Sequence, residues 1–138
     1  MRLVLLGRRK WTVYVVCSER GDCPVLDTLS QCGNAGVRLL SDLREYVPTH
    51  GPGFNEEFSK ALRDHILEFR QPTARGGTPR VLYFYARNHV IVCAVALLKK
   101  GGKIPNALIE EAIALRERYL QARDRNELLI DGIDDAEE

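Results

Sequence analysis

Apolar positions along the chain follow two different spacings, which predict a domain of mixed strands and helices. Runs rich in β-branched and aromatic residues occupy 11–17, 65–70, 80–86 and 90–99, and such runs are typical of strands. Between residues 25 and 47, and again between 105 and 123, apolar residues recur at steps of three and four, which predicts helices. We also expect a short helix over 56–64, capped by Asn55, because "EEFSKAL" holds good helix formers.

Glycine- and proline-rich segments separate these elements. The sequence "CGNAG" suggests that 25–47 forms two antiparallel helices joined near Asn34, and "PTHGPG" at 48–53 predicts a loop. The break "RNH" at 87–89 is short enough to join 80–86 and 90–99 as an antiparallel hairpin. The order of elements indicates an α+β fold, in which a small, mostly antiparallel sheet has its helices packed on one face.

A length of 138 residues suits a single domain, which we place at residues 1–123. Residues 124–138 turn acidic, and we expect them to form a disordered tail. The longest apolar run, 90–98, is too short to cross a bilayer as a helix, and "MRLVLLGRRK" does not resemble a secretory signal. We therefore expect a cytoplasmic protein with no membrane association.

Four cysteines (Cys17, Cys23, Cys32 and Cys93) are spaced irregularly and form no C-x-x-C pair. This spacing argues against a zinc ribbon and against a secreted disulfide framework. We therefore expect reduced and mostly buried thiols.

The net charge of +1 conceals a strong segregation of charge along the chain. Residues 60–103 carry nine cations and two anions, whereas residues 104–138 carry four cations and ten anions. A block with a charge of +7 over 44 residues suits phosphate binding, although such a block can also serve only to solvate a sheet edge.

Four motifs follow one another within residues 65–119: "ILEFR", "RVLYFY", a strand that closes on "KK", and "KIPNALIEEA". In this order they resemble the RelE/ParE toxin superfamily, and most of all its phage-derived HigB-like branch. The resemblance implies the RelE-like fold and a ribosome-associated mRNA endoribonuclease without a cofactor. It also implies a partner, a helix-turn-helix antitoxin of the HigA-like kind, in a type II toxin–antitoxin system.

The resemblance implies a catalytic set at the matching positions, namely Arg70, Arg80, Lys99 and Lys100. This sequence departs from the family pattern in its last strand, where a histidine and a phenylalanine are replaced by Val95 and Leu97. The missing histidine puts an imidazole acid or base in doubt.

Cations at these positions suit the cutting of RNA by its own 2′-hydroxyl, a reaction that needs charge stabilisation and proton transfer but no metal. Guanidinium groups match phosphate oxygens, and a lysine crowded by like charges is easier to deprotonate. A two-metal nuclease would need several carboxylates, and the basic block offers only Asp64 and Glu68. We expect Glu68 to hold Arg70 in place.

Further cations and rings are candidates for binding the RNA strand: Arg75, Arg87, Lys103, Tyr83 and Tyr85. If the last strand stays straight, Lys99 and Lys100 point to opposite faces and only one enters the site. His89 is expected to be a solvated turn residue.

Two other functions remain compatible with these residues. A ParE-like toxin would bind DNA gyrase and would not need cations at the strand ends. A non-catalytic, RNA-binding remnant of phage origin would account for Val95 and Leu97. Cleavage of translated mRNA separates these functions, because only the nuclease leaves new 5′-hydroxyl ends.

Overall fold

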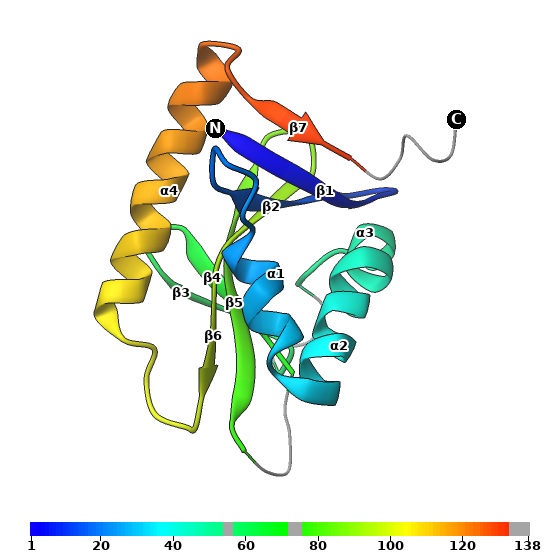
Figure 1. The fold of residues 1–138 in the computed structure, drawn as a ribbon, viewed down its shortest axis with the longest axis vertical. Coiled ribbons are helices and arrows are strands. Elements are labelled where there is room, and N and C mark those ends of the chain that lie inside the picture. Colours follow the sequence, from blue (N-terminus) through cyan, green and yellow to red (C-terminus); the bar gives the residue numbers. More distant parts are fainter. Residues whose placement is uncertain (54–56, 72–75, 133–138) are drawn as a thin grey trace.

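The computed structural model describes residues 1–53, 57–71 and 76–132, which form a seven-stranded sheet with helices (Figure 1). The sheet order is β3-β4-β5-β6-β2-β1-β7. Its strands are β1 (Arg2–Arg8), β2 (Thr12–Cys17), β3 (Ser59–Arg63), β4 (Ile66–Arg70), β5 (Thr78–Ala86), β6 (Val90–Lys99) and β7 (Leu129–Asp131). Among the described strands, only the pairs β2–β6 and β1–β7 are parallel. The expected α+β class with a mostly antiparallel sheet is confirmed.

The helical elements are α1 (Pro24–Ser30), α2 (Gly33–Ser41), a π-helical turn η1 (Asp42–Tyr46), α3 (Val47–His50) and α4 (Asn106–Asp124). The helix expected over 105–123 is therefore confirmed as α4. The expected helical region 25–47 is also present, but its first two helices meet at Gln31–Cys32, and Asn34 lies inside α2. No helix within the described residues is both long enough and apolar enough to cross a bilayer.

The hairpin β5–β6 forms the centre of the sheet, as the apolar runs predicted. The two strands pair from Thr78↔Lys99 to Ala86↔Val90, and Asn88 and His89 in the turn adopt positive φ. Strand β4 lies on the other side of β5, with Arg70 opposite Arg80. The three strands expected over 65–70, 80–86 and 90–99 are thus confirmed, and they lie next to one another in the sheet.

Helices cover both faces of the sheet, so the expectation that they pack on one face is wrong. Helices α1 to α3 lie on one side of the sheet and α4 on the other (Figure 1). Val81 and Tyr83 belong to the core under α1 to α3, whereas Leu82 and Phe84 belong to the core under α4. A strand with consecutive apolar residues is buried on both faces, and this signal was present in "RVLYFY".

The segment expected as a helix over 56–64 contains strand β3 instead. Residues 59–63 pair antiparallel with β4 across Asp64 and His65, whose φ angles are 51° and 70°. A two-residue turn with positive φ favours a tight hairpin, and the pairing outweighs the helix propensity of "EEFSKAL". Asn55, the expected cap, lies outside the described residues.

Two further strands extend the sheet beyond the expected elements. Strand β1 pairs antiparallel with β2, and the three-residue strand β7 pairs parallel with β1. The expectation of a disordered tail from residue 124 is therefore wrong for 124–131, and residues 133–138 lie outside the described part. Leu129 donates its backbone N–H to the carbonyl oxygen of Met1 at 2.8 Å, which ties the two ends together.

One pair of cysteines forms a disulfide, contrary to the expected reduced thiols. Cys17 at the end of β2 is bonded to Cys23 just before α1, across a sequence separation of six residues. Their spacing matched no common framework, so the pairing depends on the turn that brings β2 and α1 together. Cys32 and Cys93 are free.

Candidate functional site

A buried ion pair between β4 and β5 is the chemical centre of the α4 face. Arg80 is only 8% exposed and Glu68 is fully buried. One nitrogen of Arg80, Nη1, lies 3.2 Å and 3.4 Å from the two carboxylate oxygens of Glu68. The expectation that Glu68 holds Arg70 is wrong. Glu68 and Arg80 are diagonal neighbours on the same face of the β4–β5 pair, and the carboxylate of Glu68 contacts Arg80.

The Nε atom of Arg80 is buried and has no hydrogen-bond partner among the described residues. A buried donor without an acceptor costs free energy, and such groups in folded proteins usually have an explanation. The Nε atoms of Arg2 and Arg116 are in the same situation. The guanidinium of Arg80 therefore has one nitrogen fixed by Glu68 and a second nitrogen that lacks an acceptor.

An open cavity of about 530 Å³ borders Arg80, between the edge of the sheet and the start of α4. Its lining comes from β3, β4, β5, the segment before α4 and α4 itself: Lys60, Leu62, Arg63, Glu68, Arg80, Gly102, Lys103, Ile104, Asn106 and Ile109. Four of these side chains are cations and one is an anion. The cavity is therefore suited to a phosphate group.

Arg63 closes the cavity on the α4 side. Its guanidinium donates to Glu110 at 2.8 Å and to Asp64 at 2.5 Å, and it also contacts the side-chain oxygen of Asn106. Hydrogen bonds to Glu110 and Asp64 raise the pKa of Arg63 above its usual value. Because these acids offset the charge of Arg63, we assign it to joining β3 and α4.

The two lysines at the end of β6 differ in their relation to the cavity. Lys99 pairs with Thr78, which places its side chain on the same face as Arg80, and its ammonium lies beside Gly102 in the cavity wall. The side chain of Lys100 instead approaches Gly77. Of these two lysines, Lys99 is therefore the one that lies nearer the cavity.

Arg70 lies directly opposite Arg80 in the β4–β5 ladder. Its Nε donates to the backbone carbonyl oxygen of Glu57 at 2.8 Å. Directly paired residues share a face, so Arg70 adds positive charge next to the Glu68–Arg80 pair.

Tyr83 is placed where it cannot stack on a base. Its ring is fully buried and stacks on Phe69 with 3.8 Å between ring centroids. Its hydroxyl shares a hydrogen bond of 2.5 Å with Ser59, and burial raises the pKa of the Tyr83 phenol well above its usual value. The expected role of Tyr83 in RNA binding is therefore wrong.

Tyr85 and Arg87 lie at the opposite end of β5 from Arg80. Six residues of extended strand separate Arg80 from Arg87, a span of about 20 Å. The structure thus divides the expected RNA-binding residues between two places, with Lys103 in the cavity and Tyr85 and Arg87 far from it. Arg75 lies outside the described residues.

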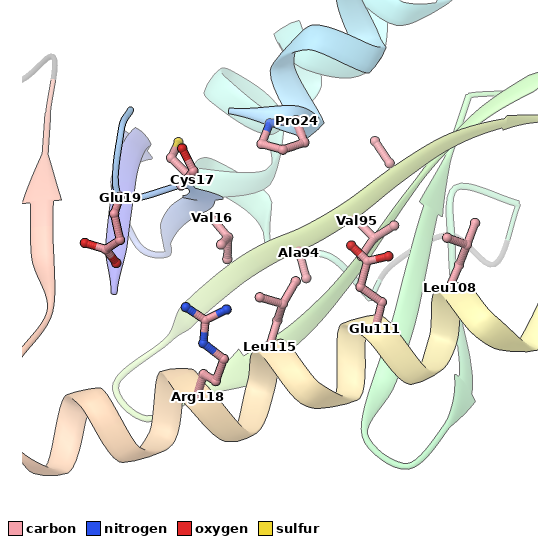
Figure 2. Close-up of a pocket in the computed structure, with 12 residues that line it drawn as sticks. Val16, Cys17, Glu19, Pro24, Ala94, Val95, Leu108, Glu111, Leu115 and Arg118 are labelled. Atoms are coloured by element: carbon pink, nitrogen blue, oxygen red, sulfur yellow. The ribbon is translucent and has the colours of Figure 1, made fainter. Parts of the chain in front are cut away.

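A second cavity, of about 420 Å³, lies between β2, β6 and α4. Figure 2 shows Val16, Ala94, Val95, Leu108 and Leu115 around it, with the charged groups Glu19, Glu111 and Arg118 among them. The three charged residues are exposed, and the buried part of the wall is apolar. This cavity offers a phosphate no buried cation, so the cavity beside Arg80 is the candidate site.

The sequence interpretation missed Lys60, Arg63 and Asn106, which also line the cavity. Lys60 and Arg63 belong to β3, which was interpreted as a helix and therefore placed away from the sheet. The dipeptide Asp64-His65 was the available signal, because Asp and His tolerate the positive φ of a tight turn.

The fold and site define a small α+β protein whose sheet is covered by helices on both faces and has a cationic cavity at one edge. The chain belongs to the family described as phage derived protein Gp49-like (DUF891), which matches residues 33–117. This family is linked to RelE-like toxins, so the resemblance seen in the sequence holds at the level of the wider toxin group. No curated protein matches the chain.

Proposed function

We propose that this protein is the toxin of a type II toxin–antitoxin system and an endoribonuclease that cuts mRNA on the ribosome without a metal. The observation that carries the proposal is the nearly buried guanidinium of Arg80, which lines a cavity together with Lys60, Arg63 and Lys103. The link between the Gp49-like family and RelE-like toxins supports the same assignment.

The proposed reaction is an attack of the 2′-hydroxyl oxygen on the adjacent phosphorus. The bond from phosphorus to the 5′-oxygen breaks, which gives a 2′,3′-cyclic phosphate and a free 5′-hydroxyl. The guanidinium of Arg80 would donate to a phosphate oxygen and stabilise the negative charge that grows in the transition state. Glu68 would orient the guanidinium by holding Nη1.

Proton transfer falls to Lys99 in this scheme, because its side chain shares the face of Arg80 and reaches the cavity wall. Its ammonium would deliver a proton to the departing 5′-oxygen, and solvent would accept the proton of the 2′-hydroxyl. Arg70, Lys60 and Lys103 would hold neighbouring phosphates of the strand.

A partner protein follows from the toxic activity. A nuclease that halts translation would harm its own cell, so we propose a HigA-like helix-turn-helix antitoxin that covers the cationic cavity. Charge complementarity favours an antitoxin segment with acidic side chains at this site. Unimpaired growth of cells that accumulate this chain alone in soluble form would contradict a toxin.

A second candidate function rests on the Glu68–Arg80 pair itself. Because Glu68 already offsets the charge of Arg80, the cavity could bind RNA and leave it intact, as in a non-catalytic remnant of phage origin. In this case the cationic lining alone would account for the site.

Primer extension on cellular mRNA after a brief induction tests the proposal. We expect new ends inside translated regions, and these ends should require phosphorylation before ligation because they carry a 5′-hydroxyl. Intact mRNA together with DNA damage would indicate a gyrase-binding toxin. Intact mRNA and DNA would indicate the non-catalytic remnant.

A further inference from the structure

Two exposed turns lie side by side at the end of β5 that is farthest from Arg80. Thr12, at the start of β2, pairs with Val90 and donates its backbone N–H to the carbonyl oxygen of His89 at 2.9 Å. The β1–β2 turn therefore adjoins the β5–β6 turn. Arg9, Lys10 and Arg87 are exposed on these turns, and residues 8–11 and 85–89 contain no acidic residue.

Three aromatic rings contact one another on these two turns. Trp11 lies 4.6 Å from His89 and 5.9 Å from Tyr85, measured between ring centroids. The backbone N–H of Trp11 donates to Pro48, and its indole packs so closely on Gly51 that a Cβ there would come within 2.8 Å of Nε1. His89 is exposed and Tyr85 is 40% exposed, so both present ring surface to solvent.

We propose that this surface is a second nucleic-acid site that binds single-stranded RNA. We call it the turn platform and define it by Arg9, Lys10, Trp11, Tyr85, Arg87 and His89. Bases stack on Tyr85 and His89, and Trp11 packs against both rings and holds them in place. The three cations contact phosphates. An acidic protein segment would satisfy the cations but would leave the ring surfaces unused, so RNA fits better.

The turn platform and the cavity beside Arg80 lie about 20 Å apart along β5. The choice of RNA over DNA rests on the proposed nuclease function. Arg9, Lys10 and Trp11 lie outside the family match at residues 33–117, so half of the platform is supplied by a part of the chain that the match does not cover.

Trp11 is the only tryptophan in the chain and reports on this site directly. The experiment titrates a 12-nucleotide single-stranded RNA with 2′-O-methyl groups, which cannot be cut, into the full chain and follows tryptophan fluorescence. We expect saturable quenching. In the variant Arg9→Gln, Lys10→Gln, Arg87→Gln, affinity should fall by about 10- to 100-fold at 0.1 M salt. The salt slope should decrease by about 2, because each phosphate contact to a single strand contributes roughly 0.7.

A matched control removes the same charge from exposed arginines elsewhere: Arg20→Gln, Arg38→Gln, Arg125→Gln. This control should bind the RNA like the native chain. The variant Tyr85→Leu should weaken binding by roughly 5- to 100-fold without changing the salt slope, because it removes stacking and keeps the charges.

Two results would overturn the turn platform as an RNA site. The first is unchanged affinity in the Arg9, Lys10 and Arg87 variant. The second is quenching by an octaglutamate peptide at lower concentration than by the RNA, which would make the surface a site for an acidic protein. Since the methylated RNA cannot be cleaved, absence of nuclease activity would leave the binding result unaffected.

Discussion

The Glu68–Arg80 pair is a buried contact that joins β4 to β5 and lies in the lining of the candidate site. Glu68 is fully buried and Arg80 nearly so, which means that either charge would be poorly hydrated if its partner were lost. The energetic cost of breaking such a pair is much larger than the net gain from forming it. Any test of Arg80 must therefore preserve the balance of charge in this part of the core.

We expect Glu68→Leu to lower the free energy of unfolding by about 3–5 kcal/mol, because Arg80 would be left buried without its anion. The double variant Glu68→Leu, Arg80→Met removes both charges and should regain most of that stability. Urea unfolding of the two variants measures the difference. Glu110→Gln, which loosens an exposed contact of Arg63, should change stability little. A double variant as unstable as the single one would contradict the role of charge balance.

The two lysines at the end of β6 should differ in their effect on cleavage. Lys99 lies beside Gly102 of the cavity wall and Lys100 approaches Gly77, so Lys99→Ala should slow cleavage by about 10²-fold while Lys100→Ala keeps the rate within about threefold. Rates of formation of 5′-hydroxyl ends give the comparison. Equal losses in both variants would show that the lysines act only through overall charge.

Individual elements differ in how far the sequence could predict them. Strands β4, β5 and β6 and helix α4 were predictable because their apolar spacing is a local property of the chain. Strand β3 was not, because its helix-forming residues become a strand only by pairing with β4. The same error removed Lys60 and Arg63 from the predicted site. The consecutive apolar residues of "RVLYFY" did indicate that Tyr83 faces a covered side of the sheet, but this signal was not used.

The contact between α1 and α2 depends on a glycine. A Cβ at Gly36 would lie 2.0 Å from the carbonyl oxygen of Leu29, so the two helices could not keep their present approach. We expect Gly36→Ala to cost about 1–3 kcal/mol of stability through this crowding. Gly53→Ala is the matched control, because a Cβ there meets nothing within 4 Å and its φ is not positive. Equal thermal unfolding temperatures for Gly36→Ala and Gly53→Ala would contradict a close approach of α1 and α2 at Gly36.

At the scale of the whole molecule, the sheet separates two apolar cores and leaves its polar chemistry at the edges and ends. The first core lies under α1 to α3 and the second under α4. Because both faces are covered, the cationic cavity lies where β3, the segment before α4 and the start of β5 meet. Sequence patterns alone could not locate this cavity, since it depends on which face each helix covers.

Cys93 in strand β6 reports on the integrity of these cores. Its thiol is fully buried, and burial raises its pKa to about 12. In a Cys32→Ser variant, where Cys93 is the remaining free thiol, a thiol reagent at pH 8 should modify it only as fast as the molecule unfolds. Stability should also fall as pH rises above about 9, because the unfolded chain releases this proton first. Rapid modification without denaturant would contradict a closed core.

The central claim is that Arg80 stabilises the transition state of RNA cleavage. The most direct measurement compares the rate of 5′-hydroxyl end formation on ribosome-bound mRNA between the native chain and the double variant Glu68→Leu, Arg80→Met. The account predicts a loss of about 10²–10³-fold in a variant that unfolds at nearly the native urea concentration. Cleavage at the native rate by the folded double variant would contradict it.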